Sequence, residues 1–254
     1  MTLLRRGVLA SAIAAAFACV TFGGGFVHAE GGPPMLTDDP GTPGDGHWEI
    51  NLAWTSQRAS SSHQDEFPLA DINYGSGDRL QLKFEMPWIV ESGGANNGFG
   101  SALIGVKWRF VDQGEDGWQV STYPQVGFRP PGLHRAASDP FTPGRLLPLE
   151  VQRDFGGFDA GFEIGREWAV PDGGDGWIAG VDAGHKFSDR FELIGELHDE
   201  TVGGEGAHEL AFNVGARQTL SGHLTLLASL GTDLDNTIGP RNRWLSYLGL
   251  QLTP

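Results

Sequence analysis

Apolar and polar residues alternate one by one along most of the chain after residue 47. In segment 79–86, Leu80, Leu82, Phe84 and Met86 fall on one face, and polar or charged residues fall on the other. A period of two is typical of a β-strand with one apolar face. Helical periodicity of useful length is absent, and 39 glycines disfavour helices. The pattern predicts twelve strands: 48–54, 67–74, 79–86, 104–110, 118–123, 146–155, 158–164, 177–183, 191–197, 210–216, 224–230 and 244–252.

The connections between these segments predict how the strands are arranged. They alternate between long and short, beginning with a long loop at 56–66 and a short turn at 75–78. Outer-membrane barrels have short periplasmic turns and longer external loops, whereas a two-sheet sandwich has no reason to alternate in this way. Aromatic residues such as Trp48, Trp108 and Trp177 lie near strand ends, as in the interfacial girdles of barrels. We therefore expect an all-β protein, a single antiparallel up-and-down transmembrane β-barrel of about 12 strands over residues 47–254.

The N-terminus has the layout of an export signal. Arg5 and Arg6 precede an apolar, Ala-rich stretch at 7–20, and small or tolerated residues surround Ala29. This predicts a signal peptide over residues 1–29, cleaved after Ala29. A lipoprotein signal ending at Cys19 is the alternative, but the bulky Phe17 stands where such signals have a small residue. Later segments do not reach the roughly 20 continuous apolar residues of a spanning helix. The predicted location is the outer membrane.

Residues 30–46 form a Gly/Pro-rich leader between the signal and the first strand. Its stretch Thr37–Pro40 favours a turn, because Asp residues precede a proline. Two interpretations stay open at this stage. The leader folds into the barrel as a small plug, or it is a disordered periplasmic segment.

Charge and motif content exclude several functions. The formal net charge of −15 opposes nucleic-acid binding, which requires a basic surface. The chain has no Gly-x-Ser-x-Gly elbow and no phosphate-binding loop. Asp233-x-Asp235-Asn236 has the start of a calcium loop, but Ile238 and Trp244 replace the glycine and glutamate that an EF-hand requires. We expect no enzymatic activity, no cofactor and no resident metal.

In a barrel, the polar faces of the strands line the lumen, where charges of both signs are interspersed. The lumen-lining candidates are Lys83, Glu85, Lys107, Arg109, Glu150, Asp159, Glu163, Asp182, Lys186, Glu192, Glu196 and Arg217. They form either a selective path lined by charge or a network of salt bridges that closes the lumen. Glycines on the same face are expected to leave space for passage: Gly105, Gly161, Gly180, Gly184 and Gly215. Arg153 and Arg166 fall on the lipid-facing parity and are expected to snorkel to the interface.

The order of several short motifs resembles a family of outer-membrane β-barrel transporters. The motifs are Pro33–Pro40, Gly46–Glu49, Asp71–Gly75, Gly98–Gly100 and Gly105–Phe110. The family is labelled as the MetA-pathway phenol-degradation family, and the resemblance is best over residues 33–130. It implies passive uptake of a small, often hydrophobic or aromatic compound. One departure is the chain end Leu252-Thr253-Pro254, where barrels commonly end on an aromatic residue.

The sequence thus predicts an outer-membrane channel or transporter. Its expected partners are outer-membrane lipid and a small-molecule solute. Two alternatives from other classes stay open. One is a structural barrel with a closed lumen, and the other is a soluble exported β-protein that binds a ligand.

Overall fold

The computed structural model describes residues 32–60, 62–90, 96–112, 114, 116–137, 139, 144–169, 174–203 and 206–254. The predicted signal peptide lies outside the described residues. The strands are β1 (Trp48–Ala59), β2 (His63–Gly75), β3 (Leu80–Val90), β4 (Gly98–Phe99), β5 (Ala102–Val111), β6 (Trp118–Thr122), β7 (Gln125–Phe128), β8 (Gly144–Asp154), β9 (Phe158–Ala169), β10 (Gly176–Ser188), β11 (Phe191–Val202), β12 (Ala207–Ser221), β13 (Leu224–Asn236) and β14 (Asn242–Leu252). Over these described ranges, no helix is long and apolar enough to cross a membrane.

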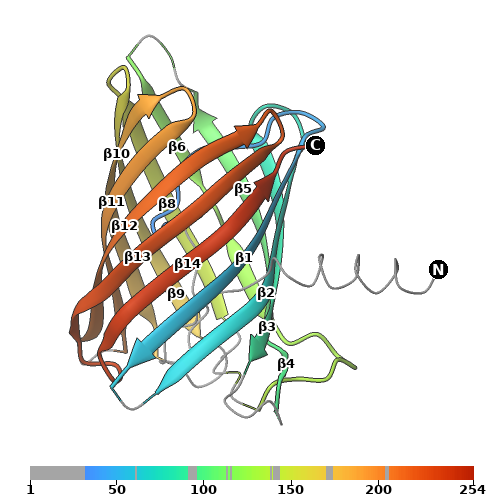
Figure 1. The fold of residues 1–254 in the computed structure, drawn as a ribbon, viewed down its shortest axis with the longest axis vertical. Helices are drawn as coiled ribbons and strands as arrows, with labels where there is room; N and C mark the ends of the chain where they lie inside the picture. Colours follow the sequence, from blue (N-terminus) through green and yellow to red (C-terminus); the bar gives the residue numbers. More distant parts are fainter. Residues whose placement is uncertain are drawn as a thin grey trace.

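The strands form one closed antiparallel barrel (Figure 1). Each long strand pairs with its sequence neighbours, and β1 also pairs with β14, which closes the ring. β6 and β7 are two halves of one strand, since both pair with β5 and β8. They are separated at Tyr123 and Pro124, where proline has no amide hydrogen for the ladder. With the short β4 as an addition to β3, the ring has twelve strands and confirms the predicted barrel.

The two faces of each strand differ in polarity as the alternation predicts. Leu82 is 48% exposed on the outside of β3, whereas the next residue, Lys83, is 6% exposed and points inward. The outer surface carries most of the exposed large apolar side chains, so it suits contact with hydrocarbon. The register shifts in β2 between Glu66 and Leu69, so both of these residues point inward although three positions separate them.

Aromatic and cationic side chains meet on the outer surface near the strand ends. The guanidinium of Arg153 lies 5.0 Å from the Trp118 ring and 4.9 Å from the Phe155 ring. Arg166 lies 5.1 Å from the Trp177 ring, and its Nη2 is 2.7 Å from Asp175 Oδ2. The guanidinium groups of Arg153 and Arg166 therefore contact aromatic or acidic side chains at the edge of the apolar band, as expected for arginines that snorkel to the interface.

The connections show which end of the barrel faces the periplasm. The end where β1 begins and β14 ends has the turns 76–79, 112–117, 155–157, 189–190 and 222–223. The opposite end has the two longest connections, 91–97 before β4 and 129–143, together with the shorter ones 60–62, 170–175, 203–206 and 237–241. Because outer-membrane barrels carry their long loops on the external side, we assign the end where β1 begins to the periplasm. The prediction of a long loop at 56–66 is wrong, because β1 continues to Ala59 and β2 begins at His63. These residues are polar on both faces, so the strands continue beyond the apolar pattern that revealed them.

Candidate functional site: the lumen of the barrel

The lumen wall is built from the inward residues of all twelve strands, and every sequence-predicted candidate belongs to it. Lys83, Glu85, Lys107, Glu150, Glu163 and Glu196 are buried at mid-barrel. Arg109, Asp159, Asp182, Glu192 and Arg217 are half-buried nearer the periplasmic end, and Lys186 is exposed at the end of β10. The structure brings the buried set together around one feature that is not part of the wall.

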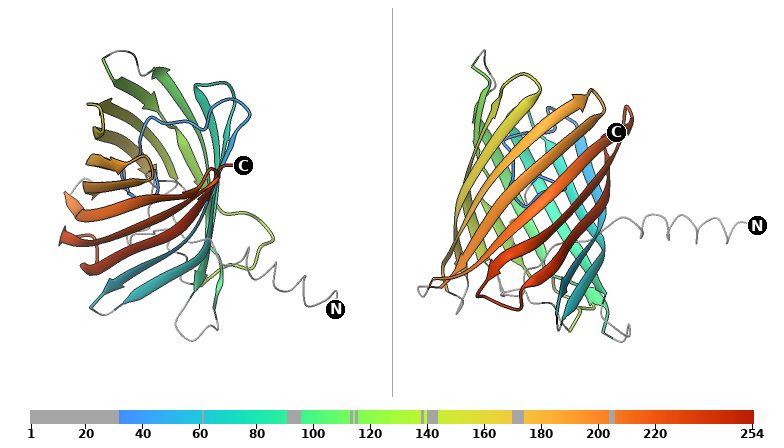
Figure 2. Two further views of the ribbon diagram at one scale, coloured as in Figure 1. Left: turned by 45° about the horizontal axis from the view of Figure 1, so that its top comes forward. Right: turned by 60° about the vertical axis from the view of Figure 1, so that its left-hand side comes forward.

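That feature is the chain before β1, residues 32–46, here called the lumen segment. It runs inside the ring of strands, where Figure 2 shows it in blue. The backbone N–H groups of Leu36 and Thr37 donate to the Glu196 carboxylate at 2.8–3.0 Å. The N–H of Asp38 donates to Glu163 Oε2 at 3.0 Å. Two glutamates on β9 and β11 thus accept hydrogen bonds from the backbone of a turn, which is a charge-assisted and therefore strong arrangement.

Lys107 on β5 links the lumen segment to the opposite wall. Its ammonium lies 2.8 Å from Asp38 Oδ1 and 3.6 Å from Glu150 Oε2, and it also donates to the carbonyl of Asp39. The same ammonium lies 4.7 Å from the centre of the Tyr123 ring. Burial raises the pKa of Asp38 above its ordinary value, and the attraction of Lys107 offsets only part of this effect. Burial opposes ionisation of Asp39, but its pKa is lowered, because Lys107, Arg217, the Gly41 N–H and Arg109 together outweigh this effect.

Arg217 on β12 holds the start of the lumen segment. Its guanidinium donates to the carbonyls of Pro33 and Gly32 at 3.2 and 3.3 Å. It also lies 3.7 Å from Asp39 Oδ2 and 3.5 Å from Glu192 Oε2. One cation therefore joins the wall, the backbone and a side chain of the segment.

The inward glycines do not leave an open path, so that expectation is wrong. A Cβ atom at Gly180 would overlap Thr37, and one at Gly215 would overlap Met35. The remaining glycines are covered by neighbouring wall residues: Gly105 by Tyr123, Gly161 by Asp182 and Gly184 by Asp159. The space that the missing side chains free is taken by the lumen segment and by long side chains of the wall.

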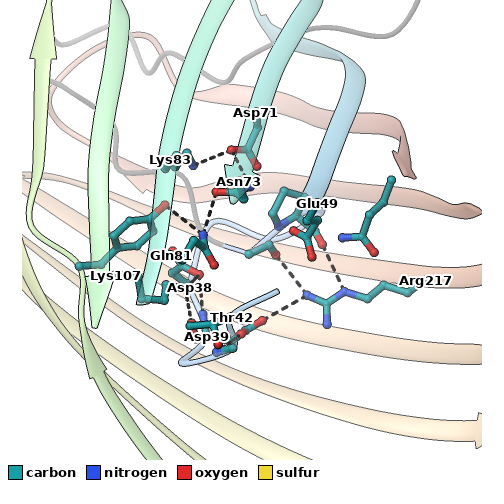
Figure 3. A pocket seen from close by; sticks show the side chains of 15 residues that line it. Asp38, Asp39, Thr42, Glu49, Asp71, Asn73, Gln81, Lys83, Lys107 and Arg217 are labelled. Carbon is teal, nitrogen blue, oxygen red and sulfur yellow. Dashed lines mark hydrogen bonds and ion pairs between the residues drawn. The ribbon is translucent and has the colours of Figure 1, made fainter. Parts of the chain in front are cut away.

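Beside the lumen segment, a cavity of about 220 Å³ remains (Figure 3). Polar groups surround it in a connected network. Asn73 Nδ2 donates to Asp71 Oδ1 at 3.0 Å, and Gln81 Nε2 donates to Asn73 Oδ1 at 2.8 Å. The ammonium of Lys83 lies 2.7 Å from Glu85 Oε2. A solute in this cavity would meet hydrogen-bonding groups and charges of both signs.

Toward the external end, five buried inward acids were missed from the sequence: Glu66, Glu167, Glu200, Glu209 and Asp233. Extending the alternation by two to four residues finds four of them, because Glu167 follows Glu163 and Glu200 follows Glu196 on the same face. Asp38, Glu49 and Asp71, which line the cavity, were also missed as lumen residues. Glu66 has no such signal, since the irregular register of β2 changes its parity.

Comparisons with known proteins identify the fold. No family model matches the chain, and no curated protein matches it. Among solved structures, the chain is similar to an outer membrane channel from Pseudomonas putida F1, with a TM-score of 0.68 and 14% identity over 85% of this chain and 98% of that one. It is also similar to the NanC porin (TM-score 0.60, 7% identity) and the KdgM porin (TM-score 0.59, 11% identity), each over 80% of this chain and 98% of the other.

The chain therefore has the fold of an outer-membrane β-barrel. Its apolar outer surface and polar interior are those of an outer-membrane protein. This confirms the class of barrel that the motif resemblance implied.

Proposed function

We propose that the protein is a passive outer-membrane channel for small polar solutes. The observation that carries the proposal is the polar cavity of about 220 Å³ inside a closed barrel whose outside is apolar. Such a lumen replaces part of the hydration of a solute while the barrel shields it from hydrocarbon. The lining favours polar solutes over the hydrophobic or aromatic ones that the motif resemblance implied.

In this proposal the lumen segment is the constriction of the channel. A twelve-stranded barrel is already narrower than the 16- to 18-stranded porins. The backbone of Leu36, Thr37 and Asp38 lies across its interior on Glu196 and Glu163. Only small solutes would then pass between the segment and the wall around Lys83 and Asn73. The KdgM porin, which has a similar fold, has been solved in complex with disordered oligogalacturonate.

Insertion into planar lipid bilayers tests the proposal. The exported protein is purified from outer membranes, and a mobility difference between unheated and boiled samples on a gel verifies that it is folded. We expect small, discrete conductance steps, and swelling of proteoliposomes in glycerol that is faster than in a trisaccharide. Folded protein without conductance and without solute-dependent swelling would refute the channel.

A closed structural barrel is the second candidate, and one observation favours it. The lumen segment is held by hydrogen bonds and ion pairs to residues of several strands, which include Lys107, Glu163, Glu196, Arg217 and Ser229. The same bilayer experiment separates the candidates, because a closed barrel folds normally and conducts nothing.

A further inference from the structure

The external half of the lumen has a different charge from the periplasmic half. The inward-facing Lys and Arg residues of the described strands are Lys83, Lys107, Arg109, Lys186 and Arg217, and all lie at mid-barrel or toward the periplasm. At the external end, Arg241 follows β13 and its Nε donates to the carbonyl of Asp233 at 2.7 Å. Toward the outside, buried carboxylates follow one another across β9, β11, β12 and β13. These are Glu167, Glu200, Glu209 and Asp233, here called the external acidic row.

The register places like charges next to each other in this row. Glu200 and Glu209 are direct cross-strand partners on β11 and β12. Like charges in directly opposite positions destabilise a sheet, so a purely structural wall would avoid them. Glu209 Oε2 and Asp233 Oδ2 both accept from the Asn236 amide, at 2.5 and 2.9 Å. Folding therefore concentrates negative charge here at a cost.

Glu167 is the member of the row on β9. It is 3% exposed, and its Oε2 atom is buried with no hydrogen-bond partner. This oxygen lies 3.5 Å from the position that a Cβ on Gly176 would take, so the carboxylate leans over β10 toward β11. Gly176 therefore leaves room for the Glu167 carboxylate over β10, whose other neighbour, β11, carries Glu200 opposite Ile178. A buried carboxylate oxygen without a donor is costly unless a ligand supplies one.

A cavity of about 270 Å³ lies at the same end of the lumen. Its lining includes Glu209, Asn236, Gln57 and His63 from four different strands. Of the acidic row, Glu209 lines this cavity, and Glu200 is its direct partner on the neighbouring strand. A small molecule in the cavity therefore lies at the Glu209 end of the acidic row.

We propose that the external acidic row binds the protonated amine of a small solute that enters the channel. This inference rests on the proposed channel function and names the class of its solute. An ammonium donates three hydrogen bonds and carries one positive charge, which suits the Glu167 oxygen and the neighbouring Glu200. A metal ion fits less well, because the described residues hold no group of three Asp, Glu, His or Cys side chains arranged to bind one.

The test measures block of the potassium current by n-butylammonium in planar bilayers. Wild type, Glu167→Gln and Glu200→Gln are compared with Asp159→Asn, a control that changes an inward carboxylate at the other end, where Asp159 Oδ2 accepts from Gln152 of the wall. Removing one of several like charges is not expected to destabilise the fold, and the heat-dependent gel shift verifies that each variant is folded. We expect butylammonium to block the wild-type current, and either external variant to weaken the block about tenfold, the value of one charge-assisted hydrogen bond. The control should change it less than about twofold.

The outcomes distinguish the inference from the function on which it rests. Conductance that butylammonium leaves unchanged, or block that Glu167→Gln and Glu200→Gln do not weaken, overturns the amine site and leaves the channel standing. Stronger block by Ca²⁺ than by butylammonium, lost in the same variants, assigns the row to inorganic cations and also overturns the inference. Absence of conductance in every folded protein refutes the channel itself.

Discussion

The two halves of the lumen are built from the same strands, but their charged side chains have different neighbours. At mid-barrel and toward the periplasm, Lys107 and Arg217 face carboxylates of the wall and of the lumen segment at 2.8–3.7 Å. Toward the outside, the cross-strand pair Glu200 and Glu209 places two acids side by side. The comparison indicates that the inner charges hold the lumen segment to the wall, whereas the outer charges are those of the proposed amine site. Removing a charge should therefore destabilise the inner half and leave the stability of the outer half nearly unchanged.

Lys107→Met should have the largest effect on stability. It leaves Asp38 and Glu150 buried without their cation, which costs about 3–5 kcal/mol of unfolding free energy. Reversible urea unfolding in detergent micelles measures the change. The double variant Lys107→Met with Asp38→Asn should recover part of the loss.

The matched variant in the outer half is Glu167→Gln, for which we expect no loss of unfolding free energy. It replaces a buried carboxyl group whose Oε2 has no hydrogen-bond partner. Equal destabilisation by Lys107→Met and Glu167→Gln would contradict the contrast between the halves.

Gly180→Leu should displace the lumen segment without changing any charge. The new side chain would occupy the position of Thr37, so the N–H groups of Leu36 and Thr37 would lose Glu196. Hydrogen bonds to a charged group are worth about 1.5–3 kcal/mol each, which sets the expected scale of the loss. In bilayers the single-channel conductance should rise, because the constriction no longer lies across the lumen.

The control for this change is Gly195→Leu on β11. A Cβ there meets only a carbonyl oxygen at 4.0 Å, and the position faces outward. Its conductance should equal that of wild type. A rise in Gly195→Leu as large as that in Gly180→Leu would show that the segment is not the constriction.

Asp39→Asn tests the lumen segment through pH. The pKa of Asp39 is lowered in the folded protein, mainly because Lys107 and Arg217 outweigh its burial. A lowered carboxyl pKa stabilises the fold above the ordinary value of 3.8, and this stability is lost as the pH falls through the folded pKa. Asp39→Asn should therefore unfold more easily at pH 7 and lose less stability on acidification. If the urea midpoint of the wild type falls no more steeply on acidification than that of Asp39→Asn, the ionised Asp39 is not stabilised by Lys107 and Arg217.

The sequence revealed the barrel because lipid imposes a strict alternation on each strand. That signal ends where a strand leaves the membrane, so the polar end of β1 around Gln57 was assigned to a loop. Glu200 and Glu209 were missed for the same reason. Glu200 follows the last regularly alternating apolar residue of β11, and Glu209 precedes the first one of β12. Alternation also identifies only a face, and Glu66 shows that one irregular register reverses it.

The lumen segment could not be placed from the sequence for a different reason. Its main partners are far away along the chain, since Leu36 and Glu196 are 160 residues apart. The segment has no periodicity of its own, so plug and disordered leader were equally compatible with its residues. The role of the inward glycines was mispredicted for the same reason. Gly180 and Gly215 make room for Thr37 and Met35 of the lumen segment, whose position the sequence did not reveal.

Ion selectivity should show the smallest effects and opposite signs in the two halves. Lys83→Gln removes a positive charge beside Asp71 and Glu85, so the ratio of potassium to chloride permeability should rise. Glu209→Gln removes a negative charge from the external acidic row, so the same ratio should fall. One charge near a hydrated path contributes about 1 kcal/mol, so each ratio should change by no more than about fivefold. Reversal potentials in a tenfold KCl gradient measure both. An ion path that passes both sites must become more cation-selective when Lys83 loses its charge and less cation-selective when Glu209 loses its charge. A shift of the reversal potential in the same direction in both variants would therefore contradict the prediction.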